Sequence, residues 1–265
     1  MKTSLKNPWT RATDSPMTSS PNKLLDLESI SKTFGSHPVL DQVSLHLDQG
    51  ELVSLLGVSG SGKTTLFNII AGLLKPDQGQ VLLEGKDITG QAGQVAYMLQ
   101  KDLLLPHLKI LDNVALPLFL KKVPKDQARK RAQSYFQQFG LAGTEGLYPS
   151  EISGGMAQRA ALLRTYLFSS KIALLDEPFS KLDAITKAKM HDWYLKIMEE
   201  IQLTTLFISH DIDEAIHLSH RIYILSPKTR SIIKEYKLDR TLDFQSQEGL
   251  LYQMDLKKQI TQDLG

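Results

Sequence analysis

Gly57-Val58-Ser59-Gly60-Ser61-Gly62-Lys63-Thr64-Thr65 is the stretch of sequence that decides the fold. A short apolar run, residues 52–56, precedes it, and an apolar pattern with helical spacing, residues 66–74, follows it. The spacing matches G-x-x-x-x-G-K-[ST], the phosphate-binding loop that joins a strand to a helix. Glycines let several backbone N–H groups turn toward one anion, and the helix start adds its positive dipole end. The stretch therefore predicts an α/β fold with a nucleotide site.

Two side chains of this loop have predicted roles. Lys63 is expected to reach the β- and γ-phosphates of a bound nucleotide, and the Thr64 hydroxyl is expected to ligate Mg²⁺. The alternative is a glycine-rich surface turn without a ligand. The apolar strand before the loop and the helical pattern after it favour phosphate binding.

Composition limits the class of protein. The chain has 265 residues, of which 42% are hydrophobic and 23% charged, as in an ordinary globular protein. The net charge of +2 gives no electrostatic indication of nucleic-acid binding. The chain has no cysteine, which excludes disulfides and cysteine-ligated zinc and is compatible with a reducing compartment. The sequence has neither an apolar run long enough to span a bilayer nor a secretory signal.

The remaining pattern predicts alternating strands and helices around the loop. Residues 1–22 are rich in Pro, Ser and Thr and are expected to be disordered. Strands are expected at 23–30, 39–47, 79–85, 95–100, 172–175, 205–208, 221–225 and 231–238. Helices are expected at 125–139, 156–168, 185–201 and 245–261. Between 101 and 150 the pattern indicates a mainly helical insert.

An apolar strand, Ile172 to Leu175, ends in Asp176-Glu177. Asp176 at the strand end is suited to hold Mg²⁺, and Glu177 is suited to orient and deprotonate an attacking water. A solvated acidic pair after a core strand is the alternative. The preceding phosphate loop favours the catalytic interpretation.

A second glycine-rich helix start follows the insert. It reads Ser153-Gly154-Gly155-Met156-Ala157-Gln158-Arg159, with Ser153 placed to cap the helix and the two glycines exposing backbone N–H groups. It is either a plain helix N-terminus or a second half of the phosphate site.

Taken in order, these motifs resemble the ATP-binding subunit of an ATP-binding cassette (ABC) transporter over residues 24–226. The resemblance implies a P-loop NTPase (RecA-like) α/β core with an antiparallel β subdomain and a helical subdomain at about 101–165. The ABC ATPase domain is expected at 23–226 and a C-terminal extension at 227–265. That extension either packs simply onto the domain or regulates it.

The same resemblance implies that two copies pack head to tail and share each ATP. Residues Gly57 through Thr65 of one copy would hold the phosphates, while Ser153, Gly154 and Gly155 of the other copy would complete the site.

Further motif positions carry implied roles. Gln100 would sense Mg²⁺ and the attacking water, and His210 would contact the γ-phosphate and steady the water with Glu177. Phe34 would stack on adenine, with a core role as its alternative. Asp183 belongs to the loop after Asp176-Glu177. Two residues differ from those usual in the family: Lys181 stands in this loop in place of alanine, and Ala157 stands in the Ser153–Arg159 motif in place of a polar or charged residue. The other six histidines are expected to be structural.

The resemblance also implies partners and location. Single cassettes without membrane spans typically power importers, so we expect ATP and Mg²⁺ as cofactors, an integral-membrane permease, an extracytoplasmic solute-binding protein and a place on the cytoplasmic membrane face. Residues 98–118 are similar to the nitrate, sulfonate and taurine importer branch, which includes thiamine-precursor transporters. Its apolar stretch 103–108 is either a permease-docking groove or insert core. One alternative is an ABC-type ATPase of nucleic-acid maintenance or translation, although no nucleic acid is expected as a partner. Another alternative is a regulatory nucleotide-binding module without turnover, and the presence of Glu177 argues against it.

Overall fold

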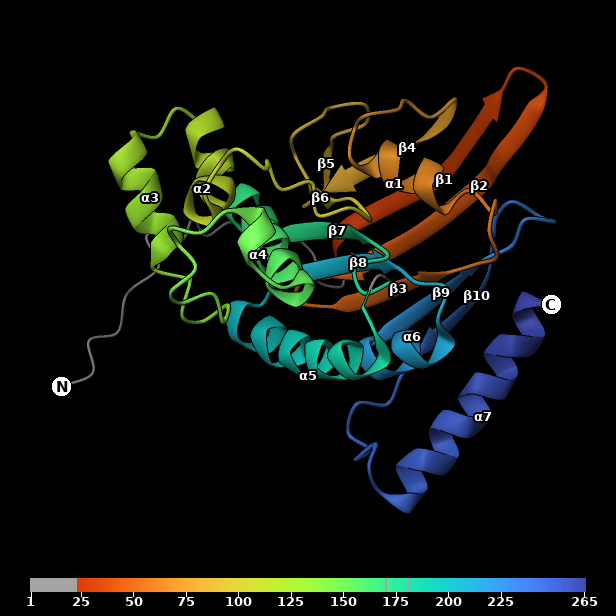
Figure 1. The fold of residues 1–265 in the computed structure, drawn as a ribbon. Helices are drawn as coiled ribbons and strands as arrows, with labels where there is room; N and C mark the ends of the chain where they lie inside the picture. The colour runs from red at the N-terminus through yellow and green to blue at the C-terminus, as the bar shows by residue number, and fades with distance from the viewer. Residues whose placement is uncertain (1–22, 170, 181) are drawn as a thin grey trace, which may run out of the picture.

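The computed structural model describes residues 23–169, 171–180 and 182–265. The segment predicted to be disordered, 1–22, and the departure at Lys181 lie outside the described residues. Figure 1 shows a mixed α/β arrangement built on two sheets.

The larger sheet carries the nucleotide loop. Its strand order is β10(Ile232–Lys237), β9(Arg221–Leu225), β3(Leu52–Leu56), β8(Thr204–Ile208), β7(Ile172–Asp176) and β6(Ala96–Met98). All neighbours are parallel except β10, which pairs antiparallel with β9. Every residue of β3, β8 and β9 is buried, as expected for apolar strands covered on both faces.

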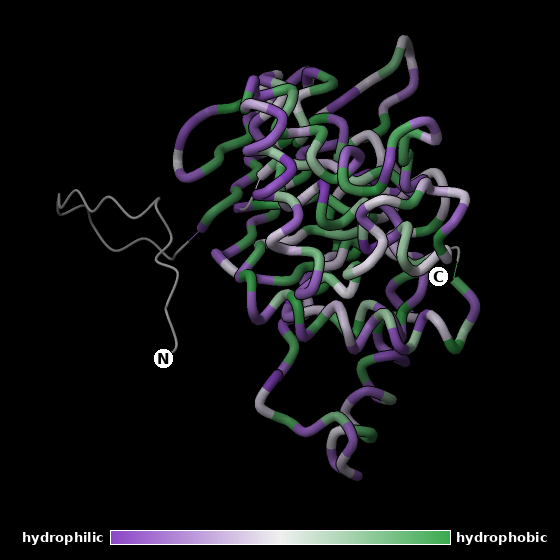
Figure 2. The backbone as a smooth tube through the Cα atoms, turned by 60° about the vertical axis from the view of Figure 1, so that its left-hand side comes forward, coloured by the Kyte–Doolittle hydropathy of each residue, from purple (hydrophilic) through white to green (hydrophobic). Residues whose placement is uncertain are grey.

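The smaller sheet is antiparallel and packs beside the loop helix. It has the order β2(His37–Asp48), β1(Lys23–Phe34), β4(Gln78–Leu83) and β5(Lys86–Asp87). Apolar side chains from β1, β2, α1(Lys63–Ile70) and β3 form one buried cluster. This shared core fixes the helix that begins at Lys63 against both sheets. Figure 2 shows hydrophilic segments in several outer turns, while hydrophobic and hydrophilic residues alternate along much of the trace.

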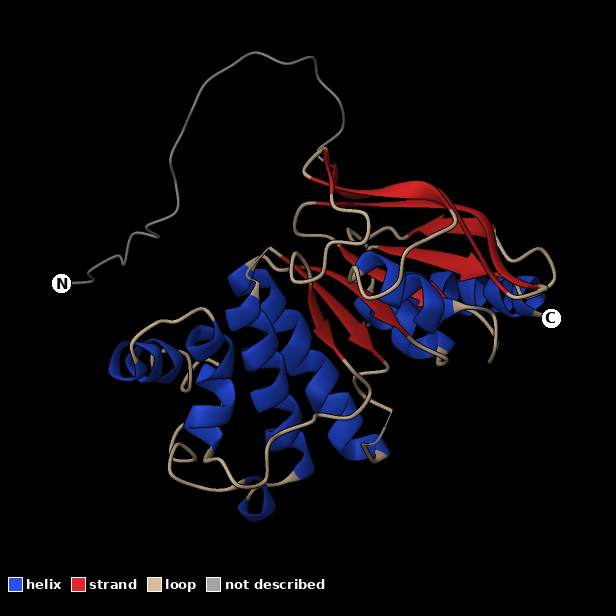
Figure 3. Cartoon of the chain, turned by 90° about the horizontal axis from the view of Figure 1, so that it is seen from above, coloured by secondary structure: helices blue, strands red, loops and turns tan. Residues whose placement is uncertain are grey.

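Helices form a subdomain beside the larger sheet (Figure 3). They are α2(Ile110–Leu120), α3(Lys125–Gln133), the short 3-10 turn η1(Pro149–Glu151) and α4(Gly154–Phe168). The helices α2, α3 and α4 share a core with α5(Ala184–Ile201). The helix predicted over 125–139 is wrong in its length, since α3 ends at Gln133. Beyond it, Tyr135 and Phe136 make i→i+3 bonds to Ala132 and Gln133, and Phe136 and Phe139 are buried in the helical core. Packing of these rings replaces the last helical turn.

The C-terminal part continues the same body. The segment α6(Ile212–Leu218) forms a third buried cluster with residues of β9, β10 and α7(Gln247–Leu264). The sequence patterns predicted β10 and α7 within a few residues but did not predict α6. Within the described residues, every helix is too short or too polar to cross a bilayer.

The predicted α/β fold class is confirmed: a P-loop core, an antiparallel β subdomain and a helical subdomain are all present.

Candidate active site

A cavity of about 420 Å³ lies at the carboxyl ends of the parallel strands. This is the edge where α/β sheets usually bind ligands. Gly57 directly follows β3, Asp176 ends β7 and Ile208 ends β8. The lining residues are Val39, Gly57, Ser59, Gly60, Gly62, Lys63, Thr64, Thr65, Asp176, Glu177, Ile208 and His210.

The phosphate loop depends on its glycines. Gly60 and Gly62 have φ angles of 80° and 101°, which side-chain-bearing residues rarely adopt. A Cβ on Gly57 would lie 2.6 Å from the carbonyl oxygen of Leu225 and 2.6 Å from Ser61 Oγ. The loop can therefore follow this path only with glycine at these positions.

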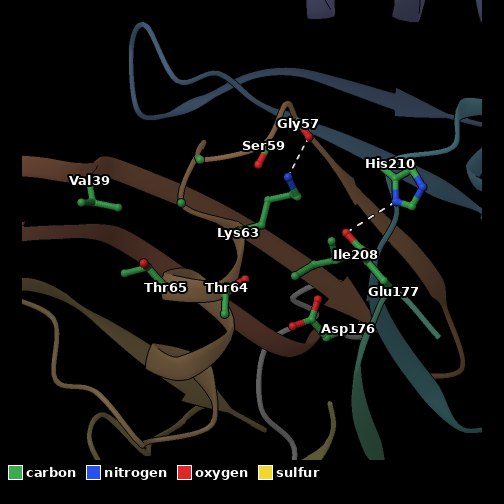
Figure 4. A pocket seen from close by; sticks show the side chains of 12 residues that line it. Val39, Gly57, Ser59, Lys63, Thr64, Thr65, Asp176, Glu177, Ile208 and His210 are labelled. Carbon is green, nitrogen blue, oxygen red and sulfur yellow. Dashed lines mark hydrogen bonds and ion pairs between the residues drawn. The ribbon is translucent and has the colours of Figure 1, made fainter. Parts of the chain in front are cut away.

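Lys63 lies in the mouth of the loop. Its Nζ donates to the carbonyl oxygen of Gly57 at 2.7 Å (Figure 4). It also donates to the carbonyl oxygen of Val58 at 3.0 Å. Burial lowers the pKa of Lys63, while the charges of Glu177 and Asp176 act in the opposite direction. Because a buried ammonium has lost most of its hydration, it is stabilised by a nearby negative charge such as that of a phosphate.

Asp176 lines the cavity from the end of β7. Burial and the neighbouring charge of Glu177 raise its pKa, and the Tyr97 hydroxyl donates a long hydrogen bond to Oδ2 at 3.5 Å. Thr64 lines the same cavity, so an oxygen-only donor set of hydroxyl and carboxylate is present, as hard divalent cations prefer. Among the residues described, no group of three or more His, Cys, Asp or Glu side chains could hold a metal alone. The donors fit Mg²⁺ whose remaining ligands come from phosphate and water.

Glu177 is the point where three segments meet. Gln100 Nε2 donates to its Oε2 at 2.8 Å, and His210 Nδ1 lies 3.5 Å from its Oε1. The Glu177 backbone has φ of 46°, and its N–H donates to the carbonyl of Ile208 at 3.1 Å. A non-glycine residue held in this conformation is typical of functional sites. The carboxylate, the amide and the imidazole are thus gathered at one place beside the cavity.

An ion-pair cluster holds the segment that carries His210. Lys187 Nζ lies 2.7 Å from Asp211 Oδ2 and 2.9 Å from Glu214 Oε2, and His191 Nε2 lies 3.1 Å from the same Glu214 oxygen. Asp211, which follows His210, also caps α6 through the N–H of Glu214. Lys187 belongs to the first turn of α5, so this cluster joins the start of α5 to the His210 loop.

Some predicted residues lie away from the cavity lining. Phe34 is 47% exposed at the end of β1. Ser153 caps α4 by accepting the Met156 N–H at 3.3 Å, and Asp183 caps α5 by accepting from Ile185 and Thr186. A Cβ on Gly155 would lie 3.7 Å from Thr186 Cγ2, so the starts of α4 and α5 are neighbours. One chain thus brings the phosphate loop, Asp176, Glu177, Gln100 and His210 together, whereas Ser153, Gly154 and Gly155 do not line the cavity. The same motif still touches the segment after Glu177, because Gln158 donates to the carbonyl of Pro178.

Two site residues were not predicted. Val39 lines the cavity from the start of β2, and Tyr97 contacts Asp176 from β6. The signal for Tyr97 lies in the strand order, because β6 is the parallel neighbour of β7. Nothing in the local sequence around Val39 distinguishes it from an ordinary strand residue.

Comparison with known proteins places this site in a family. Residues 40–180 match the ABC transporter family. The chain is 45% identical over 205 residues to the formylaminopyrimidine import ATP-binding protein ThiZ of Halalkalibacterium halodurans, covering 77% of this chain and 80% of the relative. It is 40% identical over 205 residues to the aliphatic sulfonates import ATP-binding protein SsuB of Bacillus cereus, with the same coverages.

Solved structures agree with this placement. The dimeric structure of the bacterial ABC transporter cassette MJ0796 is 31% identical, with a TM-score of 0.68, covering 81% of this chain and 99% of that chain. A post-hydrolysis dimer of the same cassette, bound to ADP and Pi, has a TM-score of 0.67 at 30% identity with the same coverages. With this fold and this site geometry, the chain belongs to the ABC transporter family, as an ATP-binding cassette that hydrolyses ATP.

Proposed function

We propose that this chain is the ATP-hydrolysing subunit of an ABC importer, energising uptake of a small solute through a separate permease. The meeting of Gln100, Glu177 and His210 beside the phosphate loop is the observation that carries the proposal. The import functions in the names of the ThiZ and SsuB relatives support it over a nucleic-acid ATPase. The solute of this proposal is of the nitrate, sulfonate and taurine type or a thiamine-precursor pyrimidine. The names of these relatives, which give a formylaminopyrimidine and aliphatic sulfonates, support that class.

The phosphates of ATP would lie in the loop from Gly57 to Thr65, facing its backbone N–H groups and the Lys63 ammonium. Thr64 and Asp176 would hold Mg²⁺. Gln100 would lie next to this ion, because it is hydrogen-bonded to Glu177, the residue after Asp176. When bound, this ion neutralises phosphate charge and aligns the β- and γ-phosphates for transfer.

Glu177 would accept a proton from the attacking water, which it orients with His210. Gln100 donates to the same carboxylate, so a movement of the helical insert that follows Gln100 would shift the hydrogen bond to the Glu177 carboxylate. This contact is the physical link between hydrolysis and the helical subdomain.

A second copy would complete the site. Ser153, Gly154 and Gly155 form an open helix start away from the cavity, which suits binding to the γ-phosphate held by a partner. Asp183 fixes the neighbouring start of α5, and Phe34 would stack on adenine at the free end of β1. The dimeric assembly of MJ0796 supports a homodimer.

The helical subdomain would receive the permease. Leu99 and Leu103 are large apolar side chains that lie exposed near Gln100, and Leu103 is 51% exposed with a φ of 47°. Arg164 of α4 holds this turn by donating to the carbonyls of Leu103 and Asp102. Docking there would put the chain on the cytoplasmic face of the membrane, opposite an extracytoplasmic solute-binding protein.

Affinity capture from native membranes tests the proposal. Tagged chain carrying Glu177→Gln, loaded with ATP, is expected to retain a multi-span permease, and Leu103→Glu in the same background is expected to lose it. Capture of ribosomes or nucleic acid in place of a permease would refute the importer function. The solute would then be identified by screening ligands against the binding protein that accompanies the permease.

A further inference from the structure

A second cavity, of about 370 Å³, lies where the C-terminal segment meets the cassette. It is lined by Gly50, Leu52, Leu195, Met198, Glu199, Gln202, His220 and Arg240. Leu52 begins β3 whereas Gly57 follows its end, so the five-residue strand separates this cavity from the ATP site by about 15 Å. Arg240 comes from the connection between β10 and α7, which passes close to α5 and α6 in Figure 1.

Arg240 is a cation with few partners of its own. Its Nη2 donates to the His217 carbonyl at 2.8 Å, and its guanidinium carbon lies 5.0 Å from the centre of the Phe244 ring. Within residues 23–169, 171–180 and 182–265, no carboxylate forms an ion pair with it. Burial lowers its pKa to about 10. A guanidinium has five N–H donors, so most of them are left for a ligand.

His220 supplies a second donor to the same cavity. Its Nδ1 accepts the backbone N–H of Leu52 at 3.0 Å, which places the proton of the neutral ring on Nε2. Partial burial and the charge of Arg240 both lower the pKa of His220, in agreement with a ring that accepts a hydrogen bond at Nδ1. The Nε2–H is therefore a neutral donor near a cation.

The rest of the lining limits the ligand. Leu52, Leu195 and Met198 provide an apolar wall, as small-molecule sites usually have beside a few polar groups. Glu199 also lines the cavity and disfavours a doubly charged anion. We propose that this cavity binds a small organic monocarboxylate, with its carboxylate on Arg240 and His220 and its apolar body on this wall.

The proposed ligand would tie two parts of the chain together. Arg240 belongs to the segment after residue 226, whereas the other seven lining residues belong to the cassette. A bound carboxylate would therefore stabilise the C-terminal segment in its packed position. It would also touch the strand that leads into the phosphate loop.

Hexanoate is the probe that we would use, in isothermal titration with the purified chain. We expect saturable binding to the wild type and to the control variant Lys237→Gln, which removes one positive charge from an exposed side chain of β10. Arg240→Gln is expected to bind at least about tenfold more weakly, since a charge-assisted hydrogen bond is lost. Equal binding by Arg240→Gln, or no saturable binding to the wild type, would overturn the proposal.

Two further measurements separate the proposed site from weak surface association. Leu195→Trp, which fills the cavity and leaves Arg240 in place, is expected to abolish hexanoate binding while retaining the thermal unfolding temperature. Hexanol and inorganic phosphate are each expected to bind more weakly than hexanoate. Binding of either one as tightly as hexanoate would contradict the assignment, and none of these readouts depends on ATP hydrolysis or transport.

Discussion

Replacing Glu177 with glutamine tests the proposed base with almost no change in shape. The amide keeps one oxygen that can accept from Gln100, which donates to the carboxylate at 2.8 Å. It loses the negative charge and the ability to take a proton from water. Because the charge of Glu177 helps to raise the pKa of Asp176, its removal favours ionised Asp176 and leaves the metal donors intact.

The size of the effect follows from these contacts. A positioned general base contributes about 10²- to 10⁴-fold to a rate, which is about 3–5.5 kcal/mol at about 1.4 kcal/mol per tenfold. The Lys63 contacts to the loop do not involve Glu177, so ATP affinity should change by less than about threefold. We therefore expect a large loss in kcat with little change in nucleotide binding.

Steady-state phosphate release and a fluorescent-nucleotide titration measure the two quantities separately. Gln100→Ala serves as the comparison, because it removes a contact to the base and leaves the base itself. Turnover by Glu177→Gln within about threefold of the wild type would refute the assignment of Glu177 as the base.

Three other perturbations have defined outcomes. Lys187→Met leaves Glu214, which is 4% exposed, without its ammonium partner, so the free energy of unfolding should fall by about 3–5 kcal/mol in urea titrations, and by less in Lys187→Arg. Burial raises the pKa of Glu214, but hydrogen bonds from His191 and Lys187 lower it, and the net result is a pKa below 4.5. The stability that the Lys187–Glu214 pair contributes is therefore present above pH 4.5 and is lost as the pH falls through the pKa of Glu214 in the folded protein. This loss should be steeper in the wild type than in Lys187→Met. A methyl group at Gly57 would lie 2.6 Å from the Leu225 carbonyl, so Gly57→Ala should weaken ATP binding at least about tenfold in the nucleotide titration; unchanged affinity would refute the requirement for glycine. Chelating divalent cations should abolish phosphate release and Mg²⁺ should restore it; residual turnover in chelator would contradict the Thr64 and Asp176 site.

The local patterns were sufficient for most of the core. Apolar runs without alternation predicted the buried strands β7 and β8 within one residue, and the glycine spacing predicted the loop that Lys63 closes. These features are set by local chemistry, namely burial on both sheet faces and backbone conformations open to glycine. The same locality explains why the carboxylates at the end of β7 were identified.

The misses come from contacts that local patterns do not contain. The helix predicted to Phe139 stops at Gln133 because the rings of Tyr135 and Phe139 pack on Tyr166 of α4. The missed helix α6 has a readable signal, since Asp211 and Glu214 stand at the spacing of a helix cap. Its seven residues were too few to give an apolar period.

The proposed completion of this site by Ser153, Gly154 and Gly155 depends on nucleotide being shared between two copies of the chain. The most direct measurement is the mass in solution of Glu177→Gln with Mg²⁺ and ATP, by light scattering during size exclusion. We expect about twice 29.7 kDa for this variant, and monomer mass when Ser153→Arg is added. Dimers that form equally well with Ser153→Arg, or monomers of Glu177→Gln at saturating ATP, would contradict the shared site.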